Sequence, residues 1–323
     1  MRQKFFIHHF LIYISVMLLI LIGCCSCNHT SASHASNTRN QNLNASDKEG
    51  GTRDNTPYVL TPEASGKTVY ENEFAVIDAS HSDQGYVMIH YLGTCEKVKV
   101  QLIGSNEEPY TYLLNQSCEW NTFPFSMGSD NYTVRILENV GGDSYAIALT
   151  QEITVSLEND FLPFLYPNQY VNFSADSQAV SMAQELSSGA DTDLDVVSNI
   201  YHYIIQNISY DTKKAETVTY GYTPDIDDTL ATGKGICFDY AALMTAMLRT
   251  QHIPTRLEVG YSGEAYHAWI STYIKDIGWI DNIIEFDGNE WKLMDPTLAA
   301  ENSEEAAEKY IGDGSNYTVK YYY

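Results

Sequence analysis

Two different hydrophobic periods divide the chain into an N-terminal and a C-terminal part. Between residues 60 and 158, apolar and polar residues alternate, as in strands that bury one face. In the segment KVKVQL, Val98, Val100 and Leu102 share one face, and turns rich in Gly, Asn, Asp and Ser separate such runs. This pattern predicts an antiparallel all-β domain, an immunoglobulin-like sandwich, over 58–160. The runs that carry it are YVMIHY, KVKVQL, YTYLL, YTVRILE and YAIALTQEITVSL.

Beyond the strand-like part, the apolar residues take a helical spacing. They predict a first helix over 174–188, which Gly189 ends. Thr192 and Asp195 lie three residues apart, as in a capping box, and therefore predict the start of a second helix.

A third predicted helix, from Cys237 to Thr250, follows a polar loop over 209–232. It is apolar on nearly every face and should lie at the centre of its domain. The strand-like runs TRLEVGYS, YHAWISTYI and EWKLMD come after it. Helices followed by strands predict an α+β domain over 170–323, in which we assign no role to the acidic, then aromatic tail 301–323.

The N-terminus has the pattern of a targeting segment. Two basic residues precede the apolar run 10–22, as in a secretory signal peptide. The run ends in LIGC, which resembles the lipobox of bacterial lipoproteins and implies cleavage after residue 23 and a lipid on Cys24. We expect 1–23 to be a lipoprotein signal peptide, 24–57 a flexible tether poor in large apolar residues, and the chain to lie on the outer face of a bacterial membrane.

Composition and charge narrow the class of partner. Hydrophobic residues make up 44 % of the chain, which is enough for sizeable cores, and the formal net charge is −24. A strongly acidic chain is unsuited to nucleic acid, whose phosphates require Lys and Arg. The acidic run at 225–228 lacks the spacing of a calcium loop, so we expect no metal and no cofactor.

Two cysteines lie inside the predicted sandwich. If 97–102 and 110–114 pair across a turn centred between residues 106 and 107, the numbers of opposite residues sum to 213, as do those of Cys95 and Cys118. A cross-strand disulfide is therefore one prediction for an exported protein. Two free thiols at strand ends are the alternative, because a register inferred from a turn alone is fragile.

Cys237 is the candidate nucleophile because it starts the third predicted helix. The positive end of a helix lowers the pKa of a thiol, and the preceding Gly-Lys-Gly allows a close approach. His252 follows the same helix and would lie about 20 Å away, at ~1.5 Å per residue, whereas His267 comes from a neighbouring strand. Asp295 ends the next strand and can orient the imidazole of His267.

Three segments, GKGICFDYAALMTAMLRTQHIPTR, YHAWI and WKLMDPT, resemble the motifs of the transglutaminase-like superfamily in their order. The resemblance covers roughly 180–300 and implies a papain-like α+β fold. It also implies a triad in which Cys237 is the nucleophile, His267 the general base and acid, and Asp295 the orienting group. A papain-type protease proper is excluded, because its His lies ~130–150 residues after the Cys.

The resemblance leaves the reaction open. Hydrolysis of an amide by a protease or amidase needs no second binding site and is our first hypothesis. Its substrate would be a protein or peptide, for example a cell-wall peptide. A transamidase that cross-links amines to glutamine and a non-catalytic surface module remain alternatives.

Several neighbours of Cys237 are candidates for supporting roles. The backbone N–H of Cys237 would form most of an oxyanion hole, with Tyr220 or Tyr222 as a further donor. Asp239 and Tyr240 either position the cysteine or serve packing alone.

Overall fold

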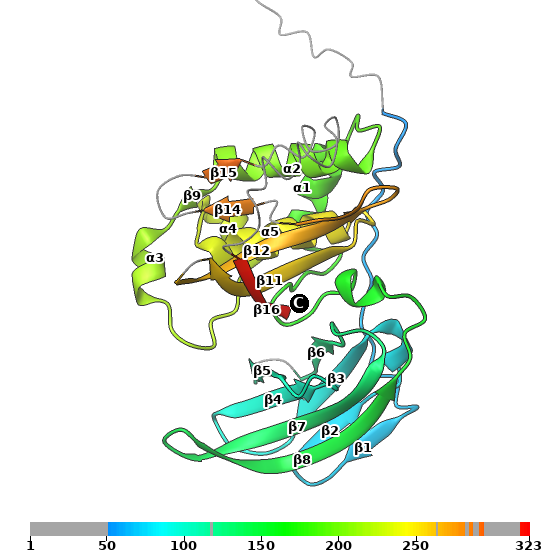
Figure 1. The fold of residues 1–323 in the computed structure, drawn as a ribbon, viewed down its shortest axis with the longest axis vertical. Coiled ribbons are helices and arrows are strands. Elements are labelled where there is room, and N and C mark those ends of the chain that lie inside the picture. Colours follow the sequence, from blue (N-terminus) through cyan, green and yellow to red (C-terminus); the bar gives the residue numbers. More distant parts are fainter. Residues whose placement is uncertain (1–50, 117–118, 263, 282–283, 287–290, 294–316) are drawn as a thin grey trace, which may run out of the picture. The chain divides into compact units, whose positions relative to one another are not determined.

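The computed structural model describes residues 51–116, 119–262, 264–281, 284–286, 291–293 and 317–323 (Figure 1). The predicted signal peptide, Cys24 and the tether up to residue 50 lie outside these residues. None of the helices in the described ranges combines the length and the hydrophobicity of a membrane span.

Two four-stranded antiparallel sheets form the N-terminal region. The first has the order β1 (Val69–Glu71), β2 (Ala75–Asp78), β3 (Tyr86–Tyr91) and β6 (Asn121–Pro124). The second has the order β5 (Pro109–Leu113), β4 (Val98–Ile103), β7 (Asp130–Gly141) and β8 (Ser144–Val155), and a short 3₁₀ turn, η1, spans Ser82–Gln84. Alternate apolar residues of both sheets share one core, which confirms the predicted antiparallel β-rich region; its immunoglobulin-like form stays a prediction.

The register of β4 and β5 differs from the predicted one by one residue. Val100 pairs with Tyr112, so opposite numbers sum to 212 rather than 213. Since side chains alternate between faces, this shift removes the argument that placed Cys95 opposite Cys118. Cys95 carries a free thiol whose Sγ lies 3.3 Å from the carbonyl oxygen of Lys97, and Cys118 lies outside the described residues. The structure therefore gives the predicted disulfide no support.

The C-terminal region begins with helices that follow a short 3₁₀ turn, η2 (Leu162–Phe164). The first predicted helix is α1 (Gln178–Leu186), and the second is α2 (Asp193–Asn207), whose capping box of Thr192 and Asp195 is present. The buried third helix is α5 (Cys237–Arg249), as predicted.

The segment predicted as a polar loop, 209–232, is instead structured. It contains β9 (Ser209–Tyr210), α3 (Thr212–Thr217) and α4 (Ile226–Thr232). Asp211 and Asp225 cap the two helices by accepting hydrogen bonds from backbone N–H groups of the first turn. Such caps stabilise short helices with little apolar surface.

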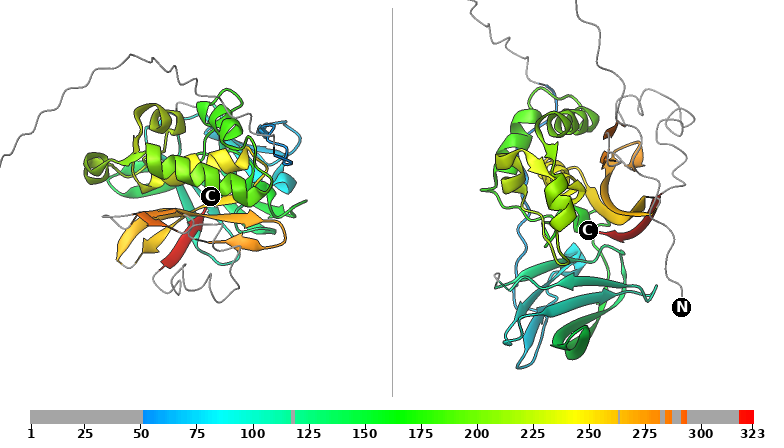
Figure 2. Two further views of the ribbon diagram at one scale, coloured as in Figure 1. Left: turned by 90° about the horizontal axis from the view of Figure 1, so that it is seen from above. Right: turned by 90° about the vertical axis from the view of Figure 1, so that its left-hand side faces the viewer.

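An antiparallel sheet of order β13-β12-β11-β16 packs against these helices. Its strands are β11 (Thr255–Ser262), β12 (Ala265–Ile274), β13 (Gly278–Ile280) and β16 (Tyr317–Tyr322). Both views in Figure 2 place the helices on one side of this sheet. Two small ladders complete the described part: β9 with β10 (Lys234–Gly235), and β14 (Ile284–Phe286) with β15 (Trp291–Leu293).

Arg249, at the end of α5, links three segments from inside the core. Its side chain is fully buried and donates hydrogen bonds to the carbonyl oxygens of Tyr166 (2.6 Å), Thr255 (2.9 and 3.0 Å) and Tyr323 (2.7 Å). A buried guanidinium requires such partners, because burial without them is costly. Arg249 therefore fixes the segment just after η2, the start of β11 and the residue that follows β16 to the central helix.

Residues 51–57, which the sequence placed in the tether, contact the helical region. Arg53 Nε lies 2.7 Å from Asp193 Oδ1, and Thr52 N donates to Asp191 Oδ1 over 2.9 Å. Just beyond this segment, the ring of Tyr58 stacks on His252 at 4.2 Å between centroids. The part of the predicted tether that the structure describes is therefore packed.

Candidate active site

Cys237 is the first residue of α5, and the chain just before it comes very close to that helix. Ile236 is the extended N-cap residue, and its N–H donates to Asp239 Oδ2 over 2.8 Å. A Cβ on Gly235 would lie 2.7 Å from the Cβ of Asp239, closer than real contacts allow. Glycine at 235 therefore permits the approach that places the thiol at the positive end of a buried helix.

Burial raises the pKa of the Cys237 thiol above its ordinary value, which is the opposite of the shift expected from the helix terminus alone. Backbone N–H groups of Ala268 and Phe238 lower this pKa, and the negative charge of Asp239 raises it. Desolvation is the largest of these effects. A thiol with a raised pKa is a weaker source of thiolate, so the use of Cys237 as a nucleophile requires a base.

His267 lies on β12 directly before Ala268, the residue whose N–H faces the Cys237 thiol. As predicted, Ala268 and Ile270 are buried in the core. The imidazole of His267 lies 6.3 Å from the ring of Trp269, centroid to centroid. The structure thus places the start of α5 against the segment of β12 that carries His267. The third triad residue, Asp295, lies outside the described residues, so its role stays a prediction.

Asp239 is fully buried in the first turn of α5 and is surrounded by donors. Lys214 Nζ lies 2.7 Å from Oδ2, and the hydroxyl of Tyr222 donates to Oδ1 over 2.5 Å. Together with the N–H of Ile236, these contacts tie α3 and the Tyr222 loop to the helix turn that begins with Cys237. The buried hydroxyl of Tyr240 donates to Ile208 O over 2.7 Å, and whether Tyr240 also positions Cys237 stays a prediction.

The two tyrosines proposed as oxyanion donors differ in their surroundings. The hydroxyl of Tyr222 is engaged by Asp239, and its ring packs against Phe238 at 6.4 Å. The side chain of Tyr220 is 72 % exposed, and Lys99 Nζ lies 5.5 Å from the centre of its ring. Tyr222 therefore orders the first turn of α5, whereas Tyr220 is available to a ligand at the surface.

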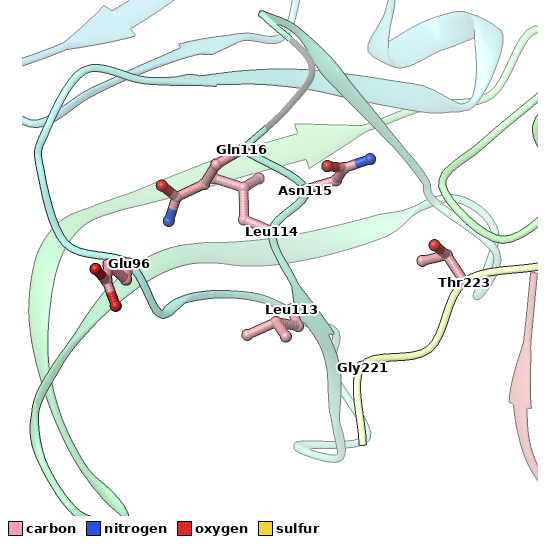
Figure 3. Close-up of a pocket in the computed structure, with 7 residues that line it drawn as sticks. All are labelled: Glu96, Leu113, Leu114, Asn115, Gln116, Gly221 and Thr223. Carbon is pink, nitrogen blue, oxygen red and sulfur yellow. The ribbon is translucent and has the colours of Figure 1, made fainter. Parts of the chain in front are cut away.

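A cavity of about 450 Å³ lies beside the Tyr222 loop (Figure 3). Gly221 and Thr223 line one part of it, and the segments around Glu96 and Leu113–Gln116 line the rest. Gly221 has a φ of 88°, and a Cβ there would lie 2.5 Å from Leu113 Cδ2. Glycine at 221 therefore allows the loop that carries Tyr222 to lie close to Leu113 of β5. Among the described residues, no group of three His, Cys, Asp or Glu side chains could hold a metal.

Sequence reasoning missed Glu258, a buried carboxyl group on β11. It is only 3 % exposed, and it accepts hydrogen bonds from Trp269 Nε1 (2.6 Å) and Ser271 Oγ (2.7 Å). A signal was present, because the alternation in TRLEVGYS puts Arg256 and Glu258 on the face opposite Leu257 and Val259. The partners of Glu258 on β12 could not be assigned from the sequence, because they depend on the register between β11 and β12.

Comparisons with known proteins agree with the local motifs. Residues 180–282 match the model of the transglutaminase-like superfamily, so this part of the chain is a transglutaminase-like domain. A search among curated proteins found no match.

Three solved structures resemble parts of the chain. A "Putative Cysteine Protease" from Cytophaga hutchinsonii is 16 % identical with a TM-score of 0.29, over 66 % of this chain and 78 % of its own. A "putative protease" from Parabacteroides distasonis is 18 % identical with a TM-score of 0.28, over 55 % and 36 %. The fn3 domain of human collagen alpha-1(XX) is 16 % identical with a TM-score of 0.22, over 29 % and 90 %.

Proposed function

We propose that the chain is a thiol enzyme that cleaves amide bonds in proteins or peptides, with Cys237, His267 and Asp295 as its catalytic triad. The observation that carries the proposal is the meeting of α5 and β12, where the N–H of Ala268, next to His267, faces the Cys237 thiol. The match to the transglutaminase-like superfamily over 180–282 supports the same assignment.

The reaction requires proton transfer because burial raises the pKa of the Cys237 thiol. His267 takes the proton of Cys237 as Sγ bonds to the carbonyl carbon of the substrate amide. The backbone N–H of Cys237 stabilises the negative oxygen that develops. When the C–N bond breaks, His267 gives the proton to the leaving amine, and a thioester remains. Water, deprotonated by His267, then adds to the thioester, and breakage of the C–S bond releases the acid and restores the thiol.

The acceptor that attacks the thioester decides the class of enzyme. Water gives a protease or amidase, which is the reaction we propose. A primary amine would give a transamidase, and the absence of both reactions would leave a non-catalytic binding module.

We also propose a location and a role for the N-terminal parts. A lipid on Cys24 would hold the protein at the outer face of a bacterial membrane, with access to cell-wall peptides. The immunoglobulin-like sandwich would then position the transglutaminase-like domain. Replacing Cys24 by alanine should change the size of the protein or its retention in the membrane fraction, and a membrane-held protein of unchanged size would contradict the lipid anchor.

The test of activity compares the full-length chain with three variants. Peptides and wall fragments are incubated with each protein, with and without a labelled primary amine, and the products are identified by mass spectrometry. Cleavage that is lost in Cys237→Ala and His267→Ala supports hydrolysis, whereas incorporation of the amine supports transamidation. Cys95→Ala is the matched control, because it removes a free thiol of the N-terminal sheets and should leave activity unchanged.

A further inference from the structure

The face of the β11–β12 ladder that carries His267 also carries a buried carboxyl group. Glu258 lies opposite Trp269, and Gly260 lies opposite His267, so Glu258, Trp269 and His267 share this face. The opposite face, with Leu257 and Ile270, belongs to the apolar core. A carboxyl group with 3 % exposure on this sheet requires strong partners.

Trp269 connects the carboxyl group to the imidazole. Its fully buried indole donates from Nε1 to Glu258 Oε2 over 2.6 Å, and its ring lies 6.3 Å from the ring of His267 at an interplanar angle of 32°. The indole N–H is a donor only, so its direction is fixed by an acceptor at the position of Glu258. The orientation of the ring beside His267 therefore depends on Glu258.

We propose that Glu258 is a positioning residue for His267, acting through the hydrogen bond that holds the Trp269 indole against the imidazole. The inference rests on the proposed function, because positioning matters only if His267 is the base for Cys237. The hydrogen bonds of Glu258 join it to Trp269 and Ser271, so we assign it a positioning role and no chemical step.

The two oxygens of Glu258 are not equivalent toward a proton. Oε2 faces the indole N–H, which cannot accept a hydrogen bond, so a proton there would break the contact with Trp269. Oε1 lies 2.7 Å from Ser271 Oγ, and a hydroxyl can turn from donor to acceptor. A proton on Oε1 therefore preserves the contact with Trp269 but weakens it, because the acceptor loses its charge.

Protonation of Glu258 falls in the physiological pH range, because burial raises the pKa of its carboxyl group to about 7. Asp281, after β13, raises it further, and Arg256 lowers it. From β12, Trp269 and Ser271 donate to it, and Tyr322 of β16 lies opposite it in the sheet. These are the groups that face Glu258 from the elements packed against it in the described part of the chain.

The experiment measures the rate at which iodoacetamide alkylates Cys237 between pH 5 and 9, read from the Cys237 peptide by mass spectrometry. Glu258→Gln keeps an acceptor for Trp269 and a donor for Ser271, so we expect a rate within about threefold of the parent at pH 8 and the loss of one ionisation near pH 7. Glu258→Leu leaves the indole N–H without its acceptor, and we expect a rate about tenfold lower. Glu152→Gln, on exposed β8, is the matched control and should match the parent.

A second measurement follows Trp269 directly. The indole N–H resonance of Trp269, assigned with Trp269→Phe, should shift with pH near 7 in the parent and not in Glu258→Gln. A resonance that does not titrate, or identical pH profiles for the parent and Glu258→Gln, overturns the inference while the proposed function stands. If His267→Ala leaves the alkylation rate unchanged, the proposed function fails, and this inference fails with it.

Discussion

Replacement of Asp239 tests whether the buried carboxylate, rather than helix packing alone, holds the start of α5 in place. Asp239 accepts hydrogen bonds from Tyr222, Lys214 and the N–H of Ile236, at 2.5, 2.7 and 2.8 Å. Asp239→Ala removes all three acceptor contacts from a fully buried position. Breaking a buried charge pair by removing one partner costs about 3–5 kcal/mol, which is a large share of the stability of an ordinary domain.

Asparagine at position 239 should cost much less, for a geometric reason. Its amide nitrogen can take the place of Oδ1 and donate to the hydroxyl of Tyr222, which can accept. Its oxygen then takes the place of Oδ2 and still accepts from Lys214 and Ile236. Only the charge is lost, and the side chain of Lys214 is 27 % exposed and can turn toward water. We therefore expect a loss of about 1–2 kcal/mol for Asp239→Asn.

The assay is urea unfolding of the full-length chain, followed by circular dichroism, with alkylation of Cys237 as a local probe. The matched control is Asp143→Asn, on the exposed β7–β8 turn, which should stay within about 0.5 kcal/mol of the parent. Addition of Tyr222→Phe to Asp239→Asn should worsen the loss, because the amide then has no acceptor. Equal losses for the alanine and asparagine variants, or an alanine variant as stable as the parent, would refute the reasoning.

Four further results are expected. Arg249→Met leaves carbonyl oxygens of three segments without their donor and should lower the free energy of unfolding by about 3–5 kcal/mol in urea titrations. Gly260→Ala should detach β16, seen as faster amide hydrogen exchange there, because the new Cβ would lie 2.0 Å from Thr318 O. The folded Glu258 keeps its proton up to about pH 7 and the unfolded one only to about 4.5, so stability should fall as pH rises through this window, by up to about 3 kcal/mol, and Glu258→Gln should flatten the curve. Alkylation of Cys237 should show an apparent pKa above that of a model thiol in the His267→Ala variant, since burial dominates once the base is gone.

Elements with strong local signals could be predicted from the sequence. The helix from Cys237 is apolar on nearly every face, and it is the buried α5. The capping box of Thr192 and Asp195 marks the start of α2 because both contacts are local. Alternation placed Ala268 and Ile270 toward the core and His267 away from it.

Features that depend on long-range pairing could not be predicted in the same way. The pairing of β16 with β11 joins segments far apart in the chain. Tyr317, Val319 and Tyr321 alternate with polar residues, but the run ends in three consecutive tyrosines, so the strand pattern is weak in the sequence. The register of β4 and β5 differed by one residue because the turn fixes it only approximately. The roles of Lys214 and Glu258 could not be predicted because their ion-pair and hydrogen-bond partners lie in other elements.

The position of Cys237 at a helix terminus predicts a lowered thiol pKa, but the pKa is raised. A terminus lowers a thiol pKa only as far as the thiol is close to it and solvated, whereas here desolvation is the larger effect. A thiol with a raised pKa needs a base to form the thiolate, so the placement of that base becomes the main requirement. In this chain that placement is set from two sides, by Asp239 at the turn that carries Cys237 and by Glu258 and Trp269 on the face that carries His267. If the proposed chemistry holds, Glu258→Leu should slow alkylation of Cys237, and only substitutions of Glu258 should remove the ionisation near pH 7.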